Sequence, residues 1–129
     1  MREIEFRGKT LQDEWIYGYI FKSQCGGYYI VDTNNDGDDG IEVRMRLVVK
    51  ETVGQYTGLK DKNGKKIFEG DIVTGLFNYT DIIGHIVYGS DATFFIERKG
   101  LYGIGLNNAE DWLEVVGNIH DNKEPLREE

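Results

Sequence analysis

The sequence predicts a mainly β fold of antiparallel strands with at most a short helical turn. Three observations support this class. Apolar and polar residues alternate along many segments, which is typical of half-buried strands. Aromatic residues, which favour strands, make up 12% of the 129 residues. The chain has 17 glycines but one proline, so many turns are expected and glycine shapes most of them.

The first two predicted strands are "REIEFR" (2–7) and "EWIYGYIFK" (14–22). The first alternates, so one of its faces is apolar and the other is charged. The second is apolar on both faces, and we therefore expect it to be buried on both sides. One of these faces carries Trp15, Tyr17, Tyr19 and Phe21.

Two more strands, "GYYIVD" (27–32) and "EVRMRLVV" (42–49), complete the N-terminal part. Between them lies "DTNNDGDDG", which is rich in turn-forming residues. In the fourth strand Arg44 and Arg46 alternate with apolar residues, so we expect the arginines to face outward.

The C-terminal part predicts a hairpin turn at "DKNG" (61–64), followed by further strands. "LNNAEDWLE" predicts one helical turn, with Asn107 or Asn108 as its N-cap. The strand series is similar to that of a small SH3-like barrel, a fold that hosts many functions. Its members are "IFEGDIV", "GHIVYG", "TFFIER" and "EVVGNI".

We therefore expect one compact unit with three parts. Residues 1–50 form an N-terminal β-sheet region, which packs on an SH3-like barrel within a core of residues 51–120. Residues 121–129 are a polar tail.

Charge and cysteine content restrict the function class. The net charge is −8, and only the segment 51–70 leans positive, so non-specific nucleic-acid binding is disfavoured. Cys25 is the single cysteine, which excludes an intrachain disulfide and fits a reducing cytosol. We interpret it as a structural or incidental thiol. With neither an apolar signal region nor a run of ~20 apolar residues, the chain is expected to be cytoplasmic.

The glycine-rich stretch "VGQYTGLKDKNGKKIFEGDIV" (53–73) is the first candidate site, as a phosphate-binding loop. Such a loop needs G-x-x-x-x-G-K-[ST] followed by a helix. Here Gly54 and Gly58 are four positions apart, Leu59 follows the second glycine, and no helix is predicted next. The stretch is interpreted as a pair of β-turns, and no cofactor is expected.

A calcium loop is the second candidate site. Asp32, Asn34 and Asp36 occupy the first, third and fifth positions of an EF-hand-like spacing. The twelfth position holds Val43 instead of the glutamate that such loops require. These three residues are weak cation candidates, and a solvated turn is the preferred interpretation.

No catalytic residues are expected, and we predict that the protein is not an enzyme. His120 and Asp121 are adjacent in sequence, which does not bring their side chains into contact, and His85 lies within an apolar strand pattern. Glu69 and Asp71 flank Gly70 and could form a carboxylate pair, although a turn with a capping aspartate explains them more simply.

A nucleic-acid-binding surface is a further candidate site. Aromatic side chains on strands can stack on bases beside a basic groove. The candidate stacking residues are Tyr17, Tyr19, Tyr28 and Tyr29. The candidate interaction surface comprises Tyr56, Lys60, Lys62, Lys65 and Lys66. The preferred alternative places the tyrosines in the core, with their hydroxyls at its rim, and makes the lysines solvated charges on a hairpin.

Three segments together resemble the YopX family: "MREIEFRGK", "VGQYTGLKDKNGKKIFEGDIV" and "LEVVGNIHDN". Their order and spacing bracket almost the whole chain. The resemblance implies a mostly β protein of unknown function, encoded by a bacteriophage or prophage, and it carries over no catalytic residue. In the middle segment the shared residues are those that turns need: Gly54, Gly58, Asp61, Gly64, Gly70 and Asp71.

The sequence therefore favours a non-enzymatic accessory protein that binds a protein partner or assembles with copies of itself. Exposed strand edges and aromatic residues commonly serve such association. A nucleic-acid-binding small-barrel protein is the alternative, and an uncharacterised enzyme is the third hypothesis.

Overall fold

The computed structural model describes residues 4–35 and 41–121. The chain divides into two compact units, Met1–Tyr56 and Thr57–Glu129. The division falls within a strand, β5 (Gly54–Lys60). Of the polar tail expected over 121–129, all but Asp121 lies outside the described residues.

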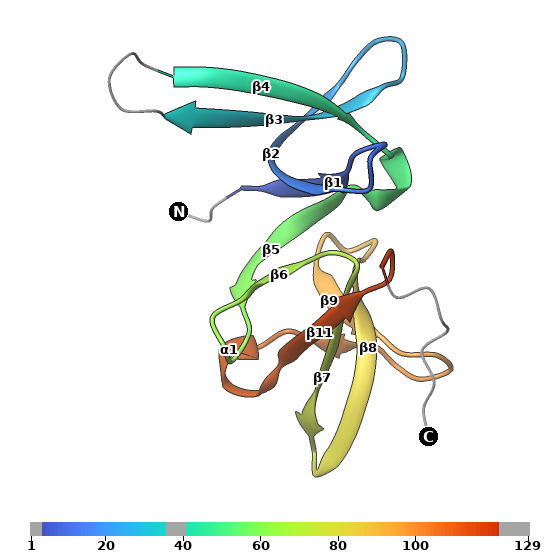
Figure 1. The fold of residues 1–129 in the computed structure, drawn as a ribbon. Helices are drawn as coiled ribbons and strands as arrows, with labels where there is room; N and C mark the ends of the chain where they lie inside the picture. Colours follow the sequence, from blue (N-terminus) through green and yellow to red (C-terminus); the bar gives the residue numbers. More distant parts are fainter. Residues whose placement is uncertain (1–3, 36–40, 122–129) are drawn as a thin grey trace. The chain divides into compact units, whose positions relative to one another are not determined.

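Four antiparallel strands and a short 3₁₀ helix build the first unit before the chain enters β5 (Figure 1). They pair in the order β4-β3-β2-β1-β5. The strand expected over 2–7 begins at Phe6 instead, and the other three expected strands are confirmed. The elements are β1 (Phe6–Lys9), β2 (Trp15–Lys22), β3 (Tyr28–Asn35), β4 (Ile41–Val48) and η1 (Lys50–Thr52).

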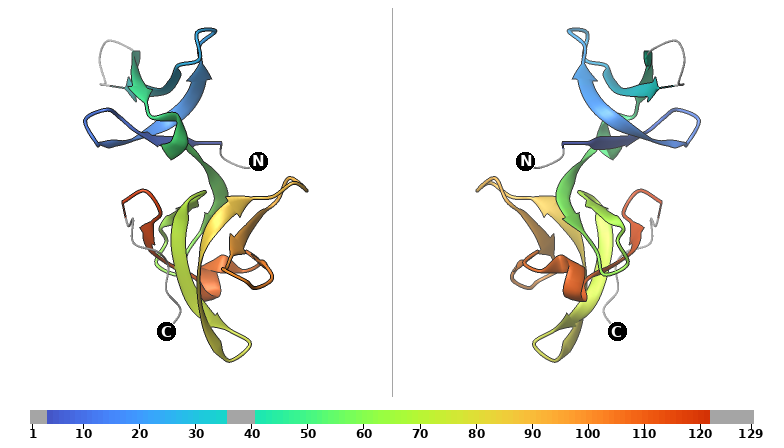
Figure 2. Two further views of the ribbon diagram at one scale, coloured as in Figure 1. Left: turned by 90° about the vertical axis from the view of Figure 1, so that its right-hand side faces the viewer. Right: turned by 90° about the vertical axis from the view of Figure 1, so that its left-hand side faces the viewer.

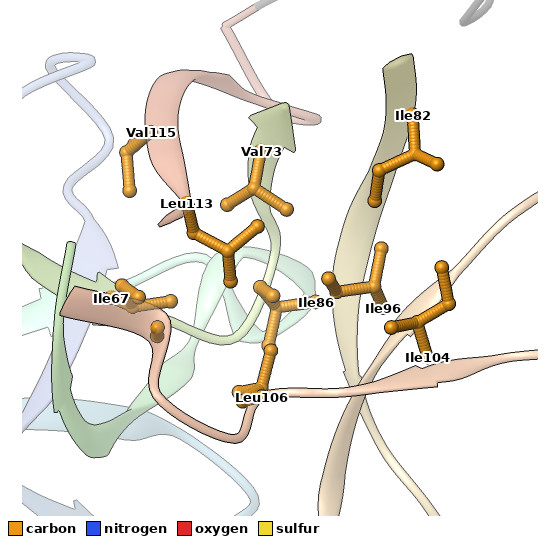
Figure 3. Packing of buried hydrophobic residues seen from close by; sticks show 10 residues of the cluster. Ile67, Val73, Ile82, Ile86, Ile96, Ile104, Leu106, Leu113 and Val115 are labelled. Carbon is orange, nitrogen blue, oxygen red and sulfur yellow. The ribbon is translucent and has the colours of Figure 1, made fainter. Parts of the chain in front are cut away.

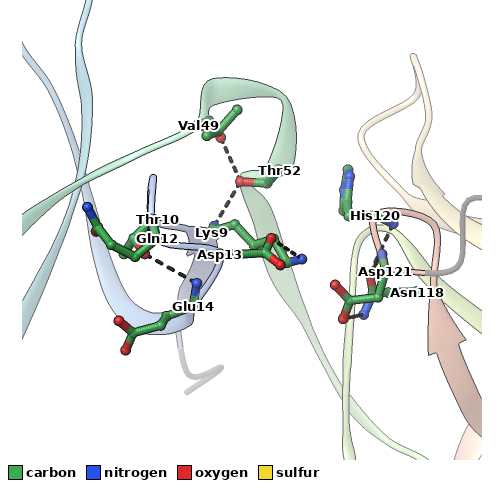
Figure 4. A network of polar contacts seen from close by, with 10 residues as sticks. All are labelled: Lys9, Thr10, Gln12, Asp13, Glu14, Val49, Thr52, Asn118, His120 and Asp121. Atoms are coloured by element: carbon green, nitrogen blue, oxygen red, sulfur yellow. Dashed lines mark hydrogen bonds and ion pairs between the residues drawn. The ribbon is translucent and has the colours of Figure 1, made fainter.

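The sheet of the first unit bends so that the end of β4 meets the end of β1. Thr10 and Val48 form an isolated antiparallel bridge, and the Val49 N–H donates to the Lys9 carbonyl at 2.8 Å. The Lys9 N–H donates to Thr52 Oγ1 at 2.8 Å, which ties η1 to β1 (Figure 4). The bent strands are visible in the side views (Figure 2). The inner side of the bend buries Ile30 and Val48.

The second unit contains a five-stranded antiparallel sheet in the order β10-β9-β8-β7-β11. Outside it, β6 is the neighbour of β5 in the other sheet. The expected helical turn is confirmed as α1, with Asn108 at its N-cap but without a side-chain capping bond. The elements are β6 (Lys66–Phe68), β7 (Asp71–Phe77), β8 (Thr80–Tyr88), β9 (Phe94–Glu97), β10 (Ile104–Gly105), α1 (Ala109–Trp112) and β11 (Glu114–Asn118).

One apolar core lies within the second unit (Figure 3). Strands β6 to β11 and α1 all contribute to it, and several members have no exposed surface. Phe94 and Trp112 pack against it from its margin. The core consists of Ile67, Val73, Ile82, Ile86, Ile96, Ile104, Leu106, Ala109, Leu113 and Val115.

The mainly β fold is confirmed, but the SH3-like barrel is not found. The described parts of the chain form two open sheets, of six and five strands, and no closed barrel. In these parts of the chain β6 pairs with β5, and no strand joins the edge strands β10 and β11 of the five-stranded sheet. Within the same described residues, no helix is long and apolar enough to cross a membrane.

Candidate functional site

The glycine-rich stretch 53–73 forms β5, a turn, β6, a second turn and the start of β7. This order differs from the loop-to-helix arrangement of a phosphate-binding loop. At the first turn Gly64 has φ 81°, in the left-handed region that glycine adopts without steric cost. Of the other predicted turn residues, Gly54 lies at the start of β5, Gly58 within β5 with φ 90°, and Gly70 in the second turn with φ 93°.

Asp61 anchors the first turn and is 2% exposed. Its Oδ1 accepts the N–H groups of Asn63 and Lys65, both at 2.9 Å. Its Oδ2 accepts the Val115 N–H of β11, also at 2.9 Å. Burial alone would raise the pKa of this carboxyl, but the three backbone hydrogen bonds, aided by the Lys65 charge, outweigh burial and lower it. The Asp61 carboxylate therefore has a structural role, since it stabilises the turn and links it to β11.

Asp71 serves the second turn in the same way. It is 2% exposed, and its Oδ2 accepts the Phe68 N–H at 2.8 Å. The Gly70 N–H donates to the Ile86 carbonyl, and the Gly70 carbonyl accepts the Ile119 N–H. Of the two residues of the possible Glu69–Asp71 carboxylate pair, Asp71 is thus buried and caps the turn.

Three of the four lysines in and beside the 61–64 turn are exposed. Lys60, Lys62 and Lys65 are exposed and Lys66 is half-buried. Lys62 Nζ lies 3.8 Å from Glu114 Oε1, so one positive charge has an acidic neighbour. The prediction that Tyr56 shares an interaction surface with these lysines is wrong, because Tyr56 is buried and only 4% exposed.

The four candidate stacking tyrosines do not share one surface. Tyr17 and Tyr19 are exposed on β2, and Tyr29 lies on the same face of the sheet. Tyr28 points to the opposite face because it is the neighbouring residue in β3. There the Nζ atoms of Lys22 and Lys50 each lie 5.7 Å from its ring centroid.

The apolar face that the sequence predicted to be buried on β2 is instead exposed. Tyr19 is 58% exposed, so neither burial of residues 14–22 on both sides nor a core position for these tyrosines holds. On β4 we expected Arg44 and Arg46 to face outward, but it is the alternating apolar side chains that lie on this exposed face, where Met45 is 55% exposed. The bend of the sheet encloses the other face, and these side chains lie on the outside.

Cross-strand pairing aligns the exposed side chains in rows. Tyr19, Val31 and Met45 form one row, and Phe21, Tyr29 and Leu47 form the next. Tyr17 extends the surface along β2 and Val43 extends it along β4. We call this surface the outer face: Tyr17, Tyr19, Phe21, Tyr29, Val31, Val43, Met45 and Leu47.

Beside the outer face, Trp15 is covered by two cations from β1. The Arg7 guanidinium lies 4.7 Å, and Lys9 Nζ 5.5 Å, from the Trp15 ring centroid. Cations over an aromatic face are attracted by its quadrupole. The apolar surface therefore ends at a charged margin on this side.

The histidines lie in separate settings. His85 Nε2 is 3.2 Å from Glu97 Oε2 on the neighbouring strand, and its buried Nδ1 has no hydrogen-bond partner among the described residues. At the end of β11, the His120 and Asp121 N–H groups donate to Asn118 Oδ1, at 3.0 and 2.8 Å (Figure 4). The adjacent His120 and Asp121 thus take part in a side-chain-capped turn.

The weak cation candidates fall on β3 and beyond it. Asp32 lies opposite Arg44, and Asn34 lies opposite Glu42. Asp36 lies outside the described residues. Among residues 4–35 and 41–121, no three His, Cys, Asp or Glu side chains are grouped to hold a metal ion. Cys25 is exposed in the turn between β2 and β3.

Comparison with known proteins identifies the family without an activity. The family model described as YopX protein matches residues 5–127. The crystal structure of protein EF1440 from Enterococcus faecalis is similar, with 27% sequence identity and a TM-score of 0.61. The similarity covers 96% of this chain and 98% of that one. No match was found among curated proteins.

Proposed function

The chain belongs to the YopX family, and this membership assigns no catalytic residue to it. We propose that the protein is a non-enzymatic interaction module. It acts as a phage or prophage accessory protein in the cytoplasm of a bacterial host. It binds a protein partner, or further copies of itself, through the outer face.

The outer face is the observation that supports this proposal. A full aromatic side chain offers roughly 150–250 Å², so the exposed fractions of this face amount to roughly 600 Å² of contiguous apolar surface. A monomer rarely exposes a patch of this size without a use for it, and such patches mark interaction sites. The most exposed members are Tyr19, Val43 and Met45.

The buried acids support a role without catalysis. Asp61 and Asp71 are the carboxylates with the most protected environments among the described residues, and backbone N–H groups bind both. Their hydrogen bonds hold turns, and the Asp61 carboxylate is a poor proton acceptor because the three backbone N–H groups stabilise its charged form and lower its pKa.

An affinity pull-down from host lysate, with and without nuclease, tests the proposal. We expect a protein partner that survives nuclease and is lost when Tyr19 and Met45 are both changed to serine. Tyr102→Ser is the matched control, because Tyr102 is 93% exposed in the second unit. A strictly monomeric protein that retains nothing from lysate would contradict the proposal.

Nucleic-acid binding is the second candidate, and the exposed Lys60, Lys62 and Lys65 in and beside the 61–64 turn favour it. It predicts binding that weakens with salt and when Lys62, Lys65 and Lys66 are replaced by alanine. Gel-shift assays with single and double strands at low salt measure it. Complete absence of binding there would dismiss this candidate.

A further inference from the structure

We propose that the occupant of the outer face is the same face of a second copy of this chain, so that the protein forms a face-to-face dimer. This inference rests on the proposed function and names the partner for its surface.

The form of the face suits another sheet. Two regular rows of side chains stand on three neighbouring antiparallel strands. Sheets pack face to face at about 10 Å, with the side chains of the two faces interdigitating. Because the face is built of repeated rows, it offers ridges to a second sheet of the same kind. The pairing of identical faces also closes the assembly at two copies.

The charge of the face favours a copy over a partner recognised by charge. All eight outer-face residues are uncharged, although the chain carries a net charge of −8. Copies of an acidic chain repel one another over most of their surface, so they can approach best where charge is absent. A strongly acidic or basic partner would find no complementary group on this face.

The area fits a specific but modest interface. Roughly 600 Å² of apolar surface per copy gives roughly 1,200 Å² for two copies, which is the lower limit for stable, specific interfaces. A second copy supplies the matching apolar area by symmetry. Any other partner would need an equally large exposed apolar face of its own.

The margin resembles the rim of an interface. Arg7 and Lys9 cover Trp15 at the β1 side. Charged groups therefore border the apolar rows on this side without entering them, as in interfaces with an apolar centre and a polar rim.

Sedimentation equilibrium of the full chain, over a range of concentrations, is the decisive measurement. At about 100 μM, well above the micromolar dissociation constants at the weak end for interfaces, we expect twice the 14.8 kDa chain mass. Met45→Lys places an unpaired charge in the buried face and is expected to raise the dissociation constant by on the order of a hundredfold.

Two further variants make the measurement specific. Leu76→Lys is the matched control, because Leu76 is 59% exposed in the second unit and Met45 is 55% exposed. It is expected to leave the dimer unchanged. Tyr19→Lys repeats the test on β2 and is expected to give the same loss as Met45→Lys. Circular dichroism of each variant establishes that it is folded before its mass is interpreted.

The possible outcomes separate this inference from the proposed function. A wild-type chain that stays monomeric, or a dimer that survives Met45→Lys and Tyr19→Lys, overturns the face-to-face dimer. If the wild-type chain is monomeric but Met45→Lys abolishes capture of a lysate protein, the dimer is overturned and the interaction module stands. If the chain is monomeric and captures nothing, both fall.

Discussion

The two units bury their apolar residues to very different extents. In the second unit, ten buried apolar residues from the strands, α1 and the segments on either side of α1 form one core. In the described part of the first unit, the buried apolar residues are Ile30, Val48 and Tyr56, while the outer face remains exposed. The second unit thus contains its own hydrophobic centre, and the first unit presents much of its apolar surface to the outside.

The size and curvature of the first sheet explain this difference. A unit of this length buries a modest share of its surface, since a 60-residue domain buries only about 60%. A single bent sheet encloses one of its faces, and the other needs a further layer to cover it. In the second unit β6, α1 and the five-stranded sheet all contribute to one core. The comparison shows that strands with alternating apolar and polar residues form a large core only where a second layer of structure covers the apolar face of the sheet.

The largest expected effect comes from the core of the second unit. Leu113→Ala removes a side chain with 0% exposure and should lower the free energy of unfolding by about 2–5 kcal/mol. Met45→Ala on the outer face should change the stability of the monomer by less than about 0.5 kcal/mol. Urea denaturation at low protein concentration measures both. Equal losses would contradict the contrast between the units.

Asp61→Asn should lower the free energy of unfolding at neutral pH by about 2–3 kcal/mol, because the amide cannot accept all three backbone N–H groups and the carboxylate charge is lost. Asp91→Asn is the control, because Asp91 is exposed. Thermal unfolding of both variants measures the difference. A change of equal size in both would show that the buried hydrogen bonds contribute little.

The same carboxylate predicts an acid dependence of the stability of the second unit. The pKa of Asp61 is lowered in the folded chain, so its contribution is complete above the unfolded value of about 3.9 and is lost as pH falls through the lower folded value. The wild-type protein should lose stability in this range more steeply than Asp61→Asn. Parallel pH profiles of the two proteins would refute this.

Gly18→Ala tests the bend of the first unit. A Cβ on Gly18 would overlap the carbonyl oxygen of Val31 on β3, so the two strands would have to move apart. We expect a loss of about 1–3 kcal/mol, the usual range for overpacking. Gly105→Ala is the control, because a Cβ there meets nothing within 4 Å. An unchanged melting temperature for Gly18→Ala would mean that the bend tolerates looser strand contact.

The smallest expected effect is a gain of stability at the β7–β8 turn. Tyr79 has φ 66° and is 99% exposed, so its backbone is strained and its side chain gains no burial to offset that strain. Tyr79→Gly should raise the free energy of unfolding by about 0.5–1 kcal/mol, since the left-handed strain of about 1–2 kcal/mol exceeds the added entropy of glycine in the unfolded chain. Tyr102→Gly, equally exposed but outside the left-handed region, should bring no gain.

Alternation predicted which side chains share a face, but not which face becomes covered. Tyr17, Tyr19 and Phe21 were placed on one face of β2, and they lie there. The sequence also suggested burial for them, because apolar residues usually lie inside. In the same way the helical turn at Ala109–Trp112 was predicted from local residues, whereas the barrel was not found. Sheet closure depends on pairing between distant strands, which local patterns do not encode.

The sequence by itself determined the local structure of this protein: the mainly β class, the turn at 61–64 and the YopX family. These follow from short-range preferences, such as glycine at positive φ and aspartate beside free backbone N–H groups. Only the tertiary structure decided that Asp61 would hold β11 from 54 positions away, that Tyr56 would be buried and that the outer face would be exposed. The reason is that burial is a property of neighbours in space, and these neighbours come from strands far apart in the chain.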